Sequence, residues 1–148
     1  MCTEQPTRRA SAQRRGERRV DPRRTLGRLG EDLAAAHFTR LGFTMLARNV
    51  HTRSGEIDLI VFDRGVLVFV EVKTRSAGFR GRRVRPEQEP LPWLRPRQRA
   101  RLRRLALAWL SDERRQRPSA HTIRFDAVGV IVDGRGELLR LDHVEAAW

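Results

Sequence analysis

Two apolar runs in the middle of the chain, at 57–62 and 66–72, have the clearest hydrophobic pattern. Both are rich in β-branched and aromatic residues and contain neither glycine nor proline. Such runs are typical of strands that are buried on both faces. Asp63-Arg64-Gly65 lies between them and has the composition of a tight turn. The pattern therefore predicts a β-hairpin in the centre of the fold.

Apolar residues at helical spacing predict two helices, one on each side of this hairpin. The first spans 25–41, with one apolar stripe, and ends before a glycine; its stripe is Leu26, Leu29, Leu33 and Ala36. The second spans 97–114, and its inner face is Gln98, Leu102, Leu105, Ala106 and Trp109. Shorter apolar runs predict further strands at 43–50, 123–132 and 138–142. The order α-β-β-β-α-β-β favours an α/β fold, with a mixed β-sheet flanked by helices.

Charged residues stand at the ends of the two hairpin strands. Side chains alternate along a strand, so Glu56 and Asp58 share one face of their strand, and so do Glu71 and Lys73 of theirs. A two-residue loop at 64–65 aligns Asp58 with Glu71 and Glu56 with Lys73. A four-residue loop keeps this register, whereas a three-residue loop shifts it by one residue. Directly opposite residues have Cβ atoms roughly 4.5–5.5 Å apart.

Two carboxylates at that distance repel each other, so one is held protonated unless a cation lies between them. Mg²⁺ prefers carboxylate and water oxygens, which makes Asp58 and Glu71 candidate metal ligands. Lys73 would then be a compact cation beside a phosphate oxygen or a water molecule. It is the only lysine in the chain, and Arg does not replace Lys where a small point charge is needed. The alternative is a salt bridge between Glu56 and Lys73 at the sheet edge, with Asp58 solvated.

Length and composition indicate one domain preceded by a basic tail. The chain has 148 residues, of which 39% are hydrophobic. Residues 1–24 hold four arginine pairs and almost no apolar side chain, so a disordered tail is expected there and a folded domain over 25–148. The single cysteine, Cys2, provides neither a disulfide nor a thiolate metal site. No run approaches the roughly 18 apolar residues of a membrane span, so no membrane partner and a cytoplasmic location are expected.

The net charge of +13 favours a polyanionic partner, most simply nucleic acid. The alternative is a general bias of the genome towards arginine, which places this residue at any solvated surface position. Candidate nucleic-acid contacts are Arg53, Arg75, Arg97 and Gln98. Arg75 follows Lys73 by two residues and is the best placed of these. Arg53 could equally be solvated in its loop, and Gln98 could equally serve only to begin the second helix.

Several short motifs occur together in the chain, and their order resembles that of a known family. Asp58, followed one strand later by Glu71-Val72-Lys73, resembles the core of the PD-(D/E)XK nuclease superfamily. The whole set resembles the YraN-like family of small bacterial proteins, placed in that superfamily near the archaeal Holliday-junction resolvases. The matching pieces are Gly30-Glu31, Leu41-Gly42-Phe43, Arg48-Asn49-Val50, Gly55-Glu56-Ile57-Asp58-Leu59-Ile60, Val68-Phe69-Val70-Glu71-Val72-Lys73 and Arg124-Phe125-Asp126.

This resemblance implies a restriction-endonuclease-like core with Mg²⁺ or Mn²⁺ as cofactor. Asp58 and Glu71 would be metal ligands, Lys73 the catalytic cation, and Glu31 an auxiliary catalytic carboxylate and further ligand. Without the resemblance, Glu31 is simply a first-turn carboxylate favoured by the helix dipole. Relatives often have lysine at the start of the second helix, where this chain has Arg97. Resolvase-like relatives work as dimers, which leaves a homodimer open.

Three functions follow from these observations. The first is a metal-dependent endonuclease that hydrolyses phosphodiester bonds in DNA, with branched or damaged DNA as candidate substrates. The second is a catalytically silent nucleic-acid-binding module with a nuclease-like fold. The third is an interaction protein whose basic surface docks an acidic partner.

Overall fold

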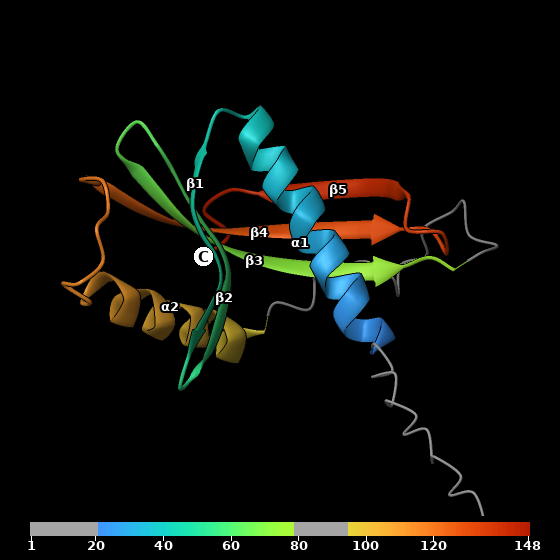
Figure 1. Ribbon diagram of the computed structural model, residues 1–148, viewed down its shortest axis with the longest axis horizontal. Helices are drawn as coiled ribbons and strands as arrows, with labels where there is room; N and C mark the ends of the chain where they lie inside the picture. The colour runs from blue at the N-terminus through green and yellow to red at the C-terminus, as the bar shows by residue number, and fades with distance from the viewer. Residues whose placement is uncertain (1–20, 79–94) are drawn as a thin grey trace, which may run out of the picture.

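A five-stranded mixed β-sheet with one helix on each face forms the folded part of the chain (Figure 1). The computed structural model describes residues 21–78 and 95–148. The elements are α1 (Pro22–Arg40), β1 (Thr44–Thr52), β2 (Gly55–Asp63), β3 (Val66–Ser76), α2 (Pro96–Leu110), β4 (Thr122–Val132) and β5 (Leu138–Val144). Neighbouring strands are antiparallel except for the parallel pair β3–β4. The predicted class and element order are confirmed and are consistent with a restriction-endonuclease-like fold.

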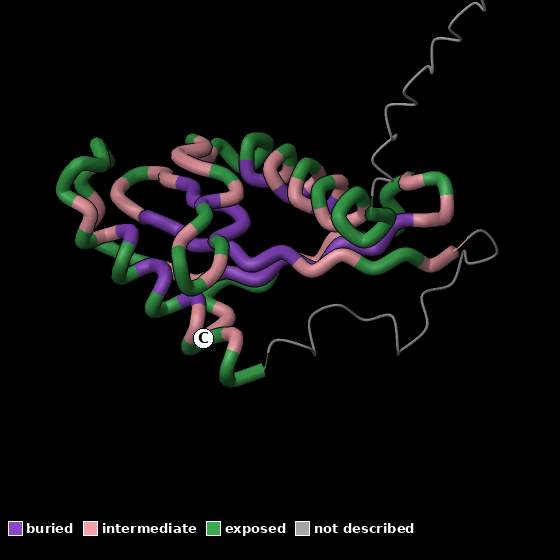
Figure 2. Tube along the Cα trace, turned by 60° about the horizontal axis from the view of Figure 1, so that its bottom comes forward, coloured by how far each residue is buried: buried purple, intermediate pink, exposed green. Residues whose placement is uncertain are grey.

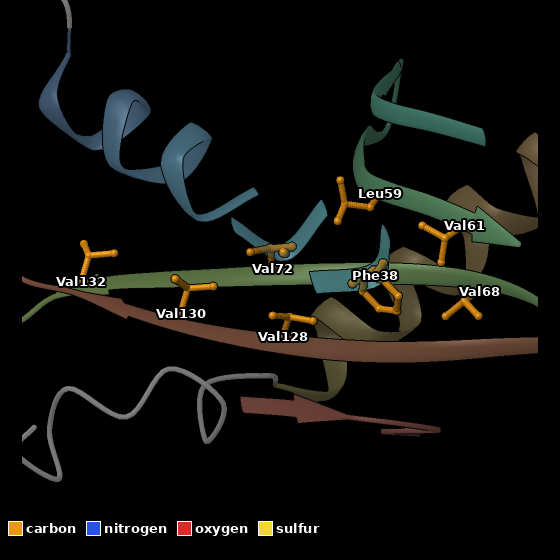
Figure 3. Packing of buried hydrophobic residues seen from close by; sticks show 10 residues of the cluster. Phe38, Leu59, Val61, Val68, Val72, Val128, Val130 and Val132 are labelled. Atoms are coloured by element: carbon orange, nitrogen blue, oxygen red, sulfur yellow. The ribbon is translucent and has the colours of Figure 1, made fainter. Parts of the chain in front are cut away.

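Helix α1 packs on one face of the sheet through its buried residues Gly30, Ala34 and Phe38. The valines of β3 and β4 lie beneath it, and Figure 3 shows Phe38 among them. The predicted leucine stripe flanks this line and is only partly buried. Ala36, which was predicted to be part of the stripe, is exposed. The helix is therefore turned slightly, so that its small residues, and not its leucines, lie closest to the strands.

The start of α1 differs from the prediction. Asp21 caps the helix by accepting a hydrogen bond from the Arg23 backbone N–H at 3.0 Å, and Pro22 occupies the first turn. A capping aspartate followed by proline is a common helix start. The helix therefore begins at Pro22, three residues before its predicted start. The rest of the predicted tail, residues 1–20, lies outside the described residues, as do residues 79–94, which include Trp93.

Helix α2 covers the opposite face of the sheet. Its predicted inner residues Leu102, Leu105, Ala106 and Trp109 are buried against a cluster that includes Phe69. The purple segments in Figure 2 show that burial is concentrated along the central strands and on the sheet-facing sides of the helices. The helix ends at Leu110 and not at residue 114, because the chain turns at 111–115. None of the described helices is long and apolar enough to cross a membrane.

The hairpin of β2 and β3 opens where its charged residues stand. Paired residues run from Asp63–Val66 to Leu59–Val70, so the predicted two-residue loop and its register are confirmed. Beyond Leu59, β2 pairs only with β1, and beyond Val70, β3 pairs only with β4. Figure 1 shows β1 and β2 turned steeply away from the direction of β3 and β4. The sheet therefore splits at Asp58 and Glu71.

A buried carboxylate, Asp126, anchors the C-terminal segment to β4. It accepts hydrogen bonds from Arg124 Nε at 2.9 Å, from Arg124 Nη2 at 2.8 Å and from the Ala146 backbone N–H at 3.0 Å. His143 Nε2 lies 2.8 Å from Asp126 Oδ2, the oxygen that also accepts from Arg124 Nη2. Asp126 therefore holds an arginine of its own strand and the C-terminal segment together.

Candidate active site

Asp58 lies at the point where β2 and β3 separate, and its side chain spans the gap. Its Oδ2 accepts a hydrogen bond from the Val72 backbone N–H at 2.7 Å. In a continuous ladder that N–H would face the neighbouring strand, so the carboxylate takes the place of a strand carbonyl. Asp58 is only 9% exposed. The separation of the strands therefore fixes the orientation of this carboxyl group.

The surroundings of Asp58 disfavour its charge. Burial and the nearby Glu71 carboxylate raise the pKa of Asp58 to about 7, and Glu31 adds to the rise. The hydrogen bond from Val72 and the charge of Lys73 lower this pKa but do not outweigh the other causes. The sequence predicted such repulsion between facing carboxyl groups. A buried acid with a raised pKa beside a second acid is an arrangement that clusters at functional sites.

Glu71 and Lys73 follow on β3, on the same side of the strand. Glu71 is buried, with 4% exposure, and its Oε1 accepts a hydrogen bond from Lys73 Nζ. The Lys73 side chain is 29% exposed, so its ammonium group reaches solvent while it contacts a buried carboxylate. Of the residues the structure describes, the buried charged ones are Asp58, Glu71 and Asp126. Two of these three meet at the split in the sheet.

Glu31 reaches this region because α1 lies unusually close to β3. A Cβ atom on Gly30 would lie 1.8 Å from Thr74 Oγ1, a distance that no pair of atoms can keep. Glycine at position 30 therefore permits the close approach, and Glu31 follows it directly. The Oε2 atom of Glu31 is buried and has no hydrogen-bond partner within the described residues. An orphaned carboxylate oxygen beside two buried acids can accept a ligand.

The carboxyl groups fit a hard divalent cation. No three acidic, histidine or cysteine side chains among the described residues meet as a ready-made metal site. Mg²⁺, however, is commonly held by one or two carboxylates, with waters and phosphate oxygens completing its shell. Asp58 and Glu71 supply two such carboxylates, and a cation between them would relieve the repulsion that raises the pKa of Asp58. Glu31 as a further ligand stays a prediction.

Glu56 does not pair with Lys73 as the register had predicted. It pairs instead with His51 of β1, whose Nδ1 lies 3.2 Å from Glu56 Oε2. The extrapolation failed because β2 has already left β3 at this point and follows β1. The alternative reading of the cluster, a Glu56–Lys73 salt bridge with a solvated Asp58, is also wrong, since Asp58 is buried.

The predicted nucleic-acid contacts lie in different places. Arg75 lies at the C-terminal end of β3 and lines a hollow of about 640 Å³ together with Glu31, Val72 and Thr74. Arg53 is exposed in the turn between β1 and β2, and Arg97 is exposed in the first turn of α2. Gln98 accepts a hydrogen bond from the Arg95 backbone N–H at 3.1 Å, which is a helix-start role. The structure therefore brings only Arg75 to the hollow beside Glu31.

A second hollow, of about 550 Å³, was missed at the sequence level. It lies on the other side of α1, shares Glu31 with the first, and is lined by Arg23, Arg24 and Arg28 of the helix. Two of these arginines had been assigned to the tail. The pair Asp21-Pro22, a helix-start signal, could have placed them on α1 from the sequence alone.

Comparison with known proteins gives the family. The profile described as "Uncharacterised protein family UPF0102" matches residues 30–130. This chain belongs to the UPF0102 family. The matched span starts at Gly30, beside Glu31, and contains both hairpin strands and most of β4.

Other UPF0102 proteins resemble the chain over most of its length. One from Acidothermus cellulolyticus is 44% identical over 117 residues, which cover 74% of this chain and 83% of that protein. One from Pelotomaculum thermopropionicum is 38% identical over 129 residues, covering 87% of this chain and 99% of that protein. A third, from Symbiobacterium thermophilum, is 48% identical over 107 residues, covering 72% and 82%. The match covers more than four-fifths of the length of each of these relatives.

Proposed function

We propose that this UPF0102 protein is a metal-dependent endonuclease that hydrolyses phosphodiester bonds in DNA, with branched or damaged DNA as candidate substrates. One observation carries the proposal. A buried carboxyl pair, Asp58 and Glu71, lies at a split between two strands, with the only lysine of the chain in contact with it. Stability alone does not explain this arrangement, because burying like charges side by side is unfavourable.

Asp58 and Glu71 would hold Mg²⁺ or Mn²⁺ through their oxygens. Such an ion supplies Lewis-acid polarisation of a phosphoryl oxygen and lowers the pKa of a bound water. The Val72 N–H keeps the Asp58 carboxylate in one orientation, so the donor atoms are preorganised before an ion arrives. Glu31, with its unpartnered oxygen, would accept a hydrogen bond from a water on the helix side of the site.

Lys73 would act on the phosphate. Hydrolysis adds water to the phosphorus atom and breaks one ester P–O bond, and negative charge grows on the phosphate oxygens as this happens. The partly exposed Lys73 ammonium group lies at the open side of the pair, where it would stabilise that charge or orient the attacking water. A metal ion bound to Glu71 would neutralise part of the carboxylate charge. It would thereby weaken the Lys73–Glu71 contact and free the ammonium group for this role.

The test is cleavage of branched and linear DNA in Mn²⁺ or Mg²⁺, with EDTA as the metal-free reference. Wild type should cut at least one substrate, and Asp58→Asn and Lys73→Ala should each lose roughly 10²-fold or more in rate, a typical cost for a charge-stabilising group. Glu113→Gln is the matched control, because it changes an exposed carboxylate that lines neither of the two hollows beside α1 and should keep activity. Activity that survives Asp58→Asn or Lys73→Ala rejects the assignment.

A catalytically silent nucleic-acid-binding module is the second candidate. It is favoured by the absence of a three-ligand group among the described residues and by the contact that engages Lys73 with Glu71. Calorimetric titration with Mn²⁺ separates the two candidates. A metal-dependent nuclease should bind the ion with a stoichiometry and affinity that Asp58→Asn abolishes. DNA binding without such ion binding would favour the module.

A further inference from the structure

The two hollows beside α1 meet on the surface of its first two turns. Arg23, Gly27 and Glu31 line both of them. These residues are spaced by four and therefore lie in a row along one side of the helix. A Cβ atom on Gly27 would meet nothing within 4 Å. The bare backbone at Gly27 thus leaves an open passage between the arginines at one end of the row and Glu31 at the other; we call the two hollows and this passage the α1 groove.

Three arginines that α1 contributes to the groove have no partner within the part of the chain that the structure describes. Arg23, Arg24 and Arg28 make no side-chain hydrogen bond or ion pair within residues 21–78 and 95–148. Asp32 lies one turn after Arg28, but it is bound to Arg48 of β1. Of the other two acids that line the hollow of about 550 Å³, Glu56 is bound to His51, and Glu31 keeps its unpartnered oxygen. Arg24 and Arg28, four residues apart on one helix, repel each other, and an anion between them would remove that repulsion.

We propose that the α1 groove binds the phosphate backbone of a nucleic-acid strand and leads it across Gly27 to Glu31. The inference rests on the proposed function, since it takes nucleic acid as the ligand and Glu31 as part of the same site. One phosphate contacts Arg24 and Arg28, and the strand continues over Gly27 towards Glu31 and Arg75, which line the hollow of about 640 Å³. Arginine suits this role because its planar guanidinium group donates to phosphate oxygens with two parallel hydrogen bonds.

Glycine at position 27 has no structural explanation of its own. It lies in the interior of α1, where glycine is less favourable than alanine, and nothing packs against the place of its missing side chain. This contrasts with Gly30, which Thr74 requires to be glycine. A phosphodiester backbone passing close to the helix supplies the missing reason, because any side chain at position 27 would stand in its path.

The experiment measures DNA affinity in the absence of divalent ions, so that it does not depend on cleavage. The probes are a short fluorescently labelled DNA duplex and the matching single strand, followed by anisotropy over a range of salt concentrations. The Arg24→Ala/Arg28→Ala variant removes two groove charges. The Arg103→Ala/Arg104→Ala variant is its control, because it removes two exposed charges of α2 that line neither hollow.

The groove variant should lower the slope of log affinity against log salt concentration by about 1 on duplex, since the two arginines contact one phosphate and each lost phosphate contact removes roughly 0.9. The control should change it by clearly less. Gly27→Leu should also weaken DNA binding, although it keeps the net charge and should raise the melting temperature. Equal losses for the two double variants, no loss for the groove variant, or undiminished binding by Gly27→Leu would each overturn the groove. None of these results would contradict the proposed function, which is tested separately by whether cleavage requires Lys73.

Discussion

Asp58 is a carboxyl group that the fold holds in an unfavourable environment. It is buried next to Glu71, and a single backbone N–H fixes its position. Because its pKa rises from 3.8 to about 7, the folded protein binds more protons than the unfolded chain between these two values. The stability of the ion-free protein should therefore fall as the pH rises through this window, and should level off above it.

Replacing Asp58 with asparagine tests whether the raised pKa of this one residue makes stability depend on pH. Asparagine keeps the shape and can still accept the hydrogen bond from Val72, but it carries no charge. In EDTA, Asp58→Asn should be more stable than wild type near pH 8, and its advantage should shrink by roughly 2 kcal/mol near pH 5. Urea unfolding at the two pH values measures this difference. An advantage that does not change with pH would show that Asp58 is not held protonated.

At the scale of elements, the approach of α1 to β3 decides where Glu31 lies. The helix crosses the half of β3 that has lost its β2 neighbour, and Gly30 is the contact point. Residues on either side of Gly30 are ordinary helix formers. The separation between helix and strand is thus set by one missing side chain, and a longer one would move Glu31 away from the carboxyl pair.

Alanine substitutions at two glycines of α1 should change the stability of the protein in opposite directions. Gly30→Ala should destabilise the protein by roughly 1–3 kcal/mol through overpacking against Thr74. Gly27→Ala should stabilise it by up to about 1 kcal/mol, because it improves helix propensity and touches nothing. Urea unfolding of both variants gives the comparison.

A background without the Thr74 side chain provides the control for this pair. In Thr74→Gly, the cost of Gly30→Ala should shrink, since the clashing atoms are gone, whereas the effect of Gly27→Ala should not change. A cost of Gly30→Ala that is the same in both backgrounds would mean that Thr74 is not what requires glycine there.

At the scale of the whole molecule, Asp126 joins parts of the fold that are far apart in the sequence. It bonds Arg124 of its own strand, the Ala146 backbone and His143, and His143 shares a 3.1 Å hydrogen bond with His37 of α1. Burial raises the pKa of Asp126, but the hydrogen bonds from His143, Arg124 and Ala146 outweigh burial and hold this pKa below its usual value. The charged form is therefore the one that the fold stabilises.

Removing that charge should cost stability in a pH-dependent way. Asp126→Asn should destabilise the protein by roughly 3 kcal/mol near neutral pH, because Arg124 then loses its buried partner and keeps only the exposed Glu145. The difference from wild type should narrow as the pH falls below about 4. There the unfolded chain binds a proton at Asp126 while the folded protein, with its lower Asp126 pKa, does not, so wild type loses stability. Denaturant unfolding near pH 7 and near pH 3 measures this. A difference that widens in acid would contradict it.

The local pattern of polar and apolar residues determined much of the secondary structure of this protein. Alternation and β-branching predicted both central strands, and Arg64-Gly65 predicted the turn whose register pairs the strands as far as Leu59–Val70, one residue from Asp58 and Glu71. These features depend on residues close together in the chain, so the sequence carries them directly. The same holds for the buried face of α2, whose helical spacing is regular.

Only the tertiary structure decided what happens beyond Leu59–Val70. Strand twist and helix packing separate β2 from β3 there, and Glu56 consequently pairs with His51 and not with Lys73. The close contact of Gly30 with Thr74 and the open groove at Gly27 have the same origin. Each depends on the distance between elements that are remote in the chain, and that distance is set by the packing of many side chains together, which no local pattern of polar and apolar residues encodes.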